Sequence, residues 1–133
     1  MIVGGGAAPK GGHYVMPHVF DDVAPDAKLA QDEVFGPVLA LIKVKDFEEG
    51  LEVANNTEYG LTGSVFTDNE QHKQEAMDRF HVGNFYINRK CTGALVGAHP
   101  FGGFNMSGTD SKAGGPDYML QFLQAKTISE KIL

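Results

Sequence analysis

The sequence predicts an α/β fold in which parallel strands are joined by helices. Residues 38–88 have the pattern of a strand, a helix, a strand, a helix and a strand, with short turns between them. A glycine-rich stretch, 88–116, then separates the last strand from a helix-like run over 116–125. This alternation is typical of right-handed β-α-β units in a parallel sheet.

The first strand of this β-α-β-α-β unit is expected at 38–44, after the punctuating Gly36-Pro37. Its sequence is apolar on both faces, as in a buried parallel strand. Asp46 is expected to cap the following helix, and Glu49 to complete a capping box. The apolar stripe of that helix is predicted to comprise Phe47, Leu51 and Ala54.

The second strand is expected at 61–67 and the third at 82–88. Asp68 is predicted to cap the helix between them, with Gln71 at the third position. Gly83 is expected to end that helix. Its buried side is predicted to comprise Ala76, Met77 and Phe80.

Weaker patterns occupy both ends of the chain. An edge strand broken by Pro17 is expected within 14–20, in a turn-rich region. Pro116 suits the first turn of a third helix over 116–125. The apolar face of that helix is predicted to comprise Tyr118, Met119, Phe122 and Leu123. Residues 126–133 alternate like a half-buried strand, which needs a partner in this chain or in another.

The composition narrows the function classes. The 133 residues suffice for one domain, with 42% hydrophobic and 21% charged residues. The net charge of -6 argues against nucleic acid or an anionic membrane as a partner. We expect no signal peptide, no membrane span and no metal site, since the histidines lack ligand spacing. A single cysteine excludes an internal disulfide and fits a cytoplasmic protein.

The stretch 88–116 contains seven glycines and follows a predicted parallel strand. Such a loop can turn at positive φ and bring bare backbone N–H groups against a ligand. Ligands of open α/β sheets bind beyond the carboxyl ends of the strands, where this loop would lie. The sequence therefore favours a binding loop for an anion or a planar ligand over a long surface loop without a ligand.

Reactive side chains are few. Cys91 lies beside Arg89 and Lys90, whose charges favour a thiolate nucleophile. No general base is identifiable, and we favour the alternative that Cys91 is a small buried hydrophobe. Asp32 and Glu33 are adjacent on an extended segment and point in opposite directions, which disfavours a shared-proton pair. One of them can instead hydrogen-bond a ligand hydroxyl, with Phe35 as an apolar face nearby.

Five motifs resemble the aldehyde dehydrogenase superfamily, in the order which that family shows. The most specific is QDEVFGPV at 31–38, which contains a Glu-x-Phe-Gly-Pro signature. The others are HYVMPHVF at 13–20, GLTGSVFT at 60–67, GNFYIN at 83–88 and PFGGFNMSG at 100–108. The segment around TGALVGAHPFGG and SGTDSKAGGPDY looks most like one branch, the 1-pyrroline-5-carboxylate dehydrogenases of proline degradation.

This resemblance implies roles for particular residues. Glu33 would bind the nicotinamide ribose hydroxyls of NAD, and Phe35 would pack near the nicotinamide ring. Thr92, Gly93 and Ala94 would form an aldehyde anchor loop whose N–H groups hold the substrate α-carboxylate. Phe101 would line the aldehyde tunnel. An exposed set of N–H groups and an aromatic wall agree with the reading from the residues alone.

The resemblance also implies what this chain does not contain. The family's nucleophilic cysteine, general-base glutamate and Rossmann domain correspond to none of its residues, and Cys91 is not that nucleophile. The chain would be the C-terminal part of the catalytic domain (1–125) followed by an oligomerisation strand (126–133), without catalytic residues of its own. The implied enzyme oxidises L-glutamate γ-semialdehyde to L-glutamate and is a homo-oligomer. Two alternatives remain, a non-enzymatic oligomerisation or binding module and a small thiol enzyme built on Cys91.

Overall fold

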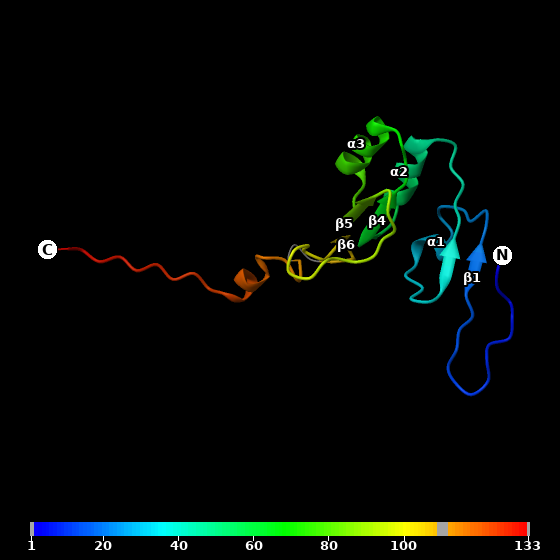
Figure 1. Cartoon of the computed structure of the whole chain (residues 1–133), viewed down its shortest axis with the longest axis horizontal. Coiled ribbons are helices and arrows are strands. Elements are labelled where there is room, and N and C mark those ends of the chain that lie inside the picture. Colours follow the sequence, from blue (N-terminus) through cyan, green and yellow to red (C-terminus); the bar gives the residue numbers. More distant parts are fainter. Residues whose placement is uncertain (1, 109–111, 133) are drawn as a thin grey trace. The chain divides into compact units, whose positions relative to one another are not determined.

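The computed structural model describes residues 2–108 and 112–132, in two compact units (Figure 1). The first unit is Met1–Glu58 and the second is Tyr59–Leu133. Residues 109–111 of the glycine-rich loop and Leu133 of the predicted terminal strand lie outside the described residues. The division predicted at residue 125 stays a prediction.

A parallel pair of strands forms the sheet of the first unit. β1 (His18–Phe20) begins directly after Pro17 and pairs with β2 (Val38–Ala40). The predicted edge strand is therefore confirmed after Pro17, whereas residues 14–16 form no strand. β2 covers only the first part of the strand predicted at 38–44. The predicted burial of both its faces is wrong, because Leu39 is 53% exposed and Val38 and Ala40 are only half-buried.

Two helices complete the first unit. α1 (Lys28–Gln31) was not predicted, and its Gln31 Nε2 donates to the carbonyl of Asn56 at 2.8 Å, tying it to the end of α2 (Phe47–Asn55). Asp46 caps α2 as predicted, accepting from the Glu49 N–H at 2.9 Å. The Glu49 carboxylate, however, accepts from the Lys45 N–H at 2.6 Å, one residue earlier than in a capping box.

The α2 stripe is partly as predicted. Leu51 is buried at 3% exposure and Phe47 is half-buried, but Ala54 is exposed. Near the first sheet, the Lys43 ammonium lies 2.7 Å from a carboxylate oxygen of Asp22. This hydrogen bond, with the charge of Asp21 adding to it, raises the pKa of Lys43 above its usual value. The pair is open to solvent and holds little of the fold together.

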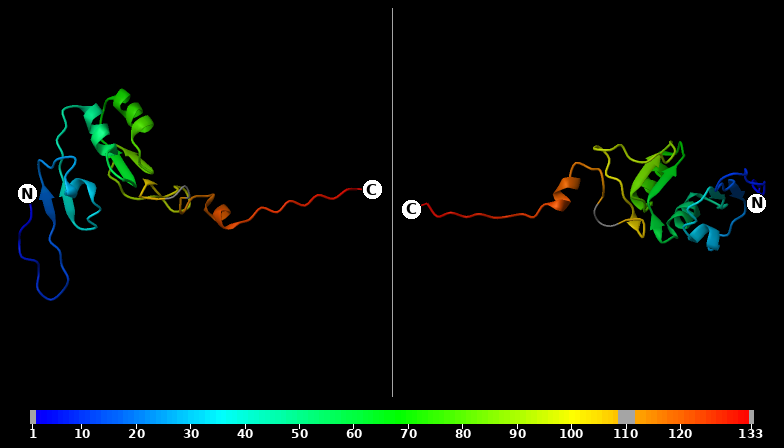
Figure 2. Two further views of the ribbon diagram at one scale, coloured as in Figure 1. Left: turned by 180° about the vertical axis from the view of Figure 1, so that it is seen from behind. Right: turned by 90° about the horizontal axis from the view of Figure 1, so that it is seen from below.

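The second unit is built on a parallel β-α-β element. β4 (Thr62–Val65) pairs with β5 (Asn84–Ile87) in parallel, and α3 (Glu70–Arg79) is the connection between them. Figures 1 and 2 show α3 running alongside this pair. Ala76 of α3 is fully buried. The parallel crossover predicted for 61–88 is therefore confirmed.

Three details of α3 differ from the sequence prediction. The helix begins one residue later than expected, because Asn69, not Asp68, accepts from the N–H groups of Gln71 and His72. Met77 is 52% exposed instead of buried, since it is turned about 100° around the helix from Ala76. The helix ends at Arg79, so Gly83 does not terminate it.

The glycine-rich loop returns to the second unit through a strand pair that was not predicted. β6 (Phe104–Asn105) pairs antiparallel with β3 (Tyr59–Gly60), next to β4 in the chain. The helix predicted over 116–125 is a short 3-10 helix, η1 (Tyr118–Phe122). Met119 and Leu123 are largely exposed, so this apolar face lacks the packing that lengthens a helix.

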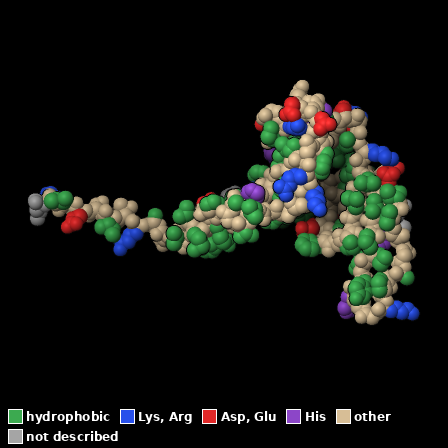
Figure 3. Space-filling model, viewed as in Figure 1, with side chains coloured by type: hydrophobic (Ala, Val, Ile, Leu, Met, Phe, Trp, Pro, Cys, Tyr) green, Lys and Arg blue, Asp and Glu red, His purple; other side chains and the backbone are tan. Residues whose placement is uncertain are grey.

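Residues 124–132 belong to no helix or strand of the described chain. Ile128 is 80% exposed and Ile132 is 94% exposed, and Figure 3 shows apolar side chains gathered just before this segment, around η1. A partner for the predicted terminal strand is therefore not found among the described residues. Of the helices in the described ranges, none has the length and apolar character needed to cross a bilayer.

The corrected cap of α3 gives a matched pair of variants. Asn69→Ala is expected to lower the free energy of unfolding by about 1 kcal/mol, because two N–H groups of the first turn lose their acceptor. Asp68→Ala is expected to change it by less than about 0.5 kcal/mol. Urea unfolding followed by circular dichroism measures both. A larger loss for Asp68→Ala than for Asn69→Ala would restore the cap predicted from the sequence.

Candidate ligand-binding sites

Several glycines of the second unit pack backbone against backbone. A Cβ at Gly83 would lie 1.7 Å from the carbonyl oxygen of Gly102, and one at Gly108 would lie 2.6 Å from that of Gly103. At Gly103 it would lie 2.7 Å from the carbonyl oxygen of Gly60. No side chain fits at these distances. These glycines therefore seat the loop against β5 and β3, and packing, not helix termination, explains Gly83.

The remaining glycines of the loop are of a different kind. Gly93, Gly97 and Gly114 have φ of +79°, +84° and +72°, and a Cβ at any of them would meet no atom within 4 Å. They are required for left-handed turns, not for close packing. The loop thus divides into a packed part around 102–108 and an open, turning part around 93–97.

The open part contains the predicted anchor segment, Thr92 to Ala94. Tyr86 Oη donates to the carbonyl of Gly93 at 2.7 Å, and Arg89 donates to Thr92 Oγ1 at 2.6 Å. Within the described residues, the N–H groups of 92, 93 and 94 donate to no acceptor. Thr92 and Gly93 are exposed and Ala94 is half-exposed. The structure therefore offers a short run of open amide donors on a loop with two fixed points.

Phe101 is bracketed by one side chain of β5. Asn84 Nδ2 donates to the carbonyl of Pro100 at 2.9 Å, and Asn84 Oδ1 accepts from the Gly102 N–H at 3.4 Å. Phe101 itself exchanges two backbone hydrogen bonds with Ala113, at 2.8 and 3.0 Å. Both sequence neighbours of the predicted tunnel residue are therefore bound by Asn84, and its own backbone is bound to Ala113 across the loop.

The Lys112 ammonium group hydrogen-bonds to the packed part of the loop. Its Nζ donates to the carbonyl of Gly83 at 2.9 Å and to that of Gly102 at 3.3 Å. The same ammonium lies 5.4 Å from the centroid of the Phe104 ring. One side chain therefore joins the residue before β5 to the residue that follows Phe101.

The sequence interpretation missed these positioning residues. Asn84 and Tyr86 lie two apart on a predicted strand, so they share one face of it. That spacing was visible in the sequence, but nothing in it told which segments the two side chains would hold. Arg89 was considered only as a charge beside Cys91, whereas its guanidinium lies 5.1 Å from the Tyr86 ring centroid.

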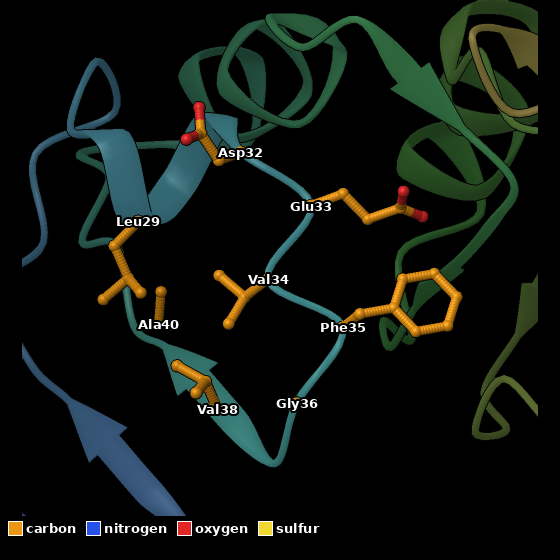
Figure 4. Close-up of a pocket in the computed structure, with 8 residues that line it drawn as sticks. All are labelled: Leu29, Asp32, Glu33, Val34, Phe35, Gly36, Val38 and Ala40. Atoms are coloured by element: carbon orange, nitrogen blue, oxygen red, sulfur yellow. The ribbon is translucent and has the colours of Figure 1, made fainter.

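A second candidate site lies in the first unit, between α1 and β2. This hollow of about 540 Å³ is lined by Leu29, Asp32, Glu33, Val34, Phe35, Gly36, Val38 and Ala40. In Figure 4 the side chain of Val34 turns toward Leu29 and Ala40, while those of Glu33 and Phe35 point together in another direction. The extended segment thus presents a carboxylate and an aromatic ring on the same side.

Phe35 is held in an unusual conformation for an aromatic residue. Its φ is +53° and it is 91% exposed. Left-handed backbone costs a residue with a Cβ about 1–2 kcal/mol, and little packing of the ring offsets that cost here. Strain of this kind that brings no packing gain is characteristic of ligand-contacting segments.

Cys91 does not behave as the sequence interpretation favoured. The thiol is exposed, so its description as a small buried hydrophobe is wrong. Within the described ranges, no group of three or more histidine, cysteine or acidic residues is placed to bind a metal ion.

Comparison with known proteins now identifies the family. The sequence profile described as "Aldehyde dehydrogenase family" matches residues 1–128. The chain belongs to the aldehyde dehydrogenase family. The superfamily resemblance drawn from the five motifs is confirmed, and the α/β fold is that of this family.

Two bacterial relatives at 61% identity are named for the same activity. The chain is 61% identical over 130 residues to 1-pyrroline-5-carboxylate dehydrogenase 2 of Bacillus subtilis strain 168, covering 98% of this chain and 25% of that protein. It is likewise 61% identical to the 1-pyrroline-5-carboxylate dehydrogenase of Bacillus pumilus, with the same coverage. The chain thus spans about a quarter of the length of these family members.

Solved aldehyde dehydrogenases have the same backbone course. A 1-pyrroline-5-carboxylate dehydrogenase from Thermus with bound NAD superposes with a TM-score of 0.94 at 52% identity, covering 98% of this chain and 25% of that one. A Mycobacterium tuberculosis aldehyde dehydrogenase complexed with NAD+ gives a TM-score of 0.77 at 35% identity, with coverage of 92% and 25%.

The close packing at Gly83 predicts how a substitution there changes stability. Gly83→Ala is expected to destabilise the second unit by about 3 kcal/mol or more, because the new methyl meets the Gly102 carbonyl. Gly97→Ala is the matched control in the same loop, and strain alone should cost it about 1 kcal/mol. Denaturant unfolding of both variants measures the difference. Equal losses would show that close packing at Gly83 contributes nothing.

Proposed function

We propose that this chain supplies the matched quarter of an NAD-dependent aldehyde dehydrogenase that oxidises L-glutamate γ-semialdehyde to L-glutamate in proline degradation. The observation that carries the proposal is the run of open amide donors at 92–94. A carboxylate is the ligand that such donors fit best, because each N–H carries a partial positive charge. An α-carboxylate on the aldehyde meets this requirement.

Phe101 fits the same proposal. It follows the anchor segment on the same loop and is fixed by Asn84 and Ala113. A rigid, half-buried aromatic ring suits the short aliphatic stem of the aldehyde better than it suits a charged group. In the proposed enzyme the amides of Thr92, Gly93 and Ala94 bind the carboxylate, and Phe101 lines the path of the stem.

The side of the extended segment that carries Glu33 and Phe35 fits the nicotinamide half of NAD. Glu33 presents an exposed carboxylate, which accepts hydrogen bonds and so suits ribose hydroxyls. Phe35 presents a ring that is 91% exposed, as a flat partner for an aromatic ligand requires. Bound NAD would supply the hydride acceptor that oxidation of the aldehyde requires. The two side chains orient the cofactor and take no part in bond-making.

Cys91 has no catalytic role in this proposal. It lies between the cation–π pair of Tyr86 and Arg89 and the anchor segment, and the segment's backbone is what contacts the substrate. The relative at 61% identity is about four times longer than the matched region, so the proposed nucleophile and general base come from elsewhere in the enzyme. This chain then contributes recognition of cofactor and carboxylate.

A chimaera tests the proposal directly. The 130 matched residues of the Bacillus subtilis enzyme are replaced by those of this chain, and NADH formation is followed with L-glutamate γ-semialdehyde. We expect kcat/KM within about tenfold of the parent, and a loss of about tenfold or more in NAD affinity for Glu33→Ala. The 133-residue chain alone is the control and should form no NADH. A folded chimaera without activity would contradict the proposal, as would NADH formation by the chain alone.

The exposed tail supports a homo-oligomer as part of the same proposal. Ile128 and Ile132 are four apart and both largely exposed, and the backbone of 126–132 pairs with nothing in the described chain. A segment with unpaired N–H and C=O groups and one apolar face suits addition to a sheet of a second copy. The same feature favours the alternative of a non-enzymatic oligomerisation module.

Sedimentation distinguishes the tail's contribution. Deleting 126–133 from the chimaera is expected to reduce its sedimentation coefficient toward that of a monomer, since the tail's backbone would then have no strand to add. Lys126→Ala, which keeps the backbone, is the control and should leave the sedimentation coefficient unchanged. An unchanged coefficient after deletion would remove the tail from the interface. Oligomers that form without any effect of aldehyde or NAD on thermal unfolding would favour the non-enzymatic alternative.

A further inference from the structure

The anchor segment is oriented from beneath by a buried tyrosine. Tyr86 is 8% exposed and lies on β5, the rigid parallel strand of the second unit. Its hydroxyl donates to the carbonyl of Gly93 at 2.7 Å, seven residues further along the chain. A loop carbonyl that could otherwise face solvent is thereby turned toward the strand.

The orientation of that carbonyl fixes the neighbouring amide. Gly93 and Ala94 share one peptide plane, and the chain has no cis peptide among its described residues. In a trans peptide the C=O and the following N–H point in opposite directions. With the Gly93 carbonyl drawn toward Tyr86, the Ala94 N–H must point away from β5, where an anion can approach it.

Arg89 fixes both the tyrosine ring and the start of the segment. Its guanidinium lies 5.1 Å from the Tyr86 ring centroid and donates to Thr92 Oγ1 at 2.6 Å. The carbonyl of Arg89 in turn accepts from Ser64 Oγ of β4. The side chain and backbone of this residue thus connect Thr92 to the Tyr86 ring and to β4.

We propose that Tyr86, backed by Arg89, is a positioning residue that sets substrate specificity by aiming the Ala94 N–H at the α-carboxylate of the aldehyde. The inference rests on the proposed function, because it concerns the same anchor segment. Tyr86 does not touch the substrate. It acts by preorganising a donor, which removes the cost of turning the peptide plane when the acid binds.

The test is Tyr86→Phe in the chimaera, which keeps the ring and its stacking with Arg89 but removes the hydroxyl. KM for L-glutamate γ-semialdehyde is expected to rise about tenfold, because the hydrogen bond that orients the Gly93–Ala94 peptide is lost. The value of kcat should change little. The kcat/KM for butanal, which has no carboxylate, should stay within about twofold. Tyr118→Phe is the matched control, because Tyr118 packs by its ring on Phe122 outside the loop, and both substrates should be unaffected.

Different results would contradict the role of Tyr86 and the proposed function of the enzyme. An equal loss for both aldehydes in Tyr86→Phe, or a lowered melting temperature without a change in KM, would assign Tyr86 a structural role only and overturn the inference. No change with either aldehyde would overturn it as well. A parent chimaera that folds but does not oxidise L-glutamate γ-semialdehyde would instead overturn the proposed function, and this inference with it.

Discussion

The close approach of Gly83 to the carbonyl of Gly102 is the constraint on which the second unit depends. A Cβ at that position would lie 1.7 Å from the carbonyl oxygen, so the loop contacts the strand through bare backbone. Lys112 strengthens this seat by donating to both carbonyls. Because the packed part around 102–108 is fixed in this way, the open part around 93–97 can be exposed while the loop keeps one position on the strand.

β5 then serves as a platform with two holding points. Asn84 and Tyr86 project from the same face, two residues apart, and hold the segments around Phe101 and Gly93 respectively. A flexible loop would lose conformational entropy when it binds an acid. A loop held at both segments has already lost that entropy on folding. The substrate-binding role proposed for this family member therefore follows from the strand as much as from the loop.

Sequence patterns predicted the elements better than their edges. The β-α-β crossover of 61–88 follows from period and turn residues, but Asp68 and Asn69 are both good caps, and only the backbone path decides between them. The burial of Leu39 and Met77 was predicted wrongly because a pattern shows which side chains are apolar, not whether anything covers them. The roles of Glu33, Phe35 and 92–94 came from resemblance, since neither strain at Phe35 nor the Tyr86 hydrogen bond can be read from spacing.

A crystal structure of the chimaera with bound L-glutamate tests the central claim most directly. The account predicts that the α-carboxylate accepts hydrogen bonds from the backbone N–H groups of 92–94, with the Gly93 carbonyl still bound by Tyr86 and the acid's stem against Phe101. A carboxylate held instead by side chains far from this segment would contradict the account, and the assignment of substrate would fail with it.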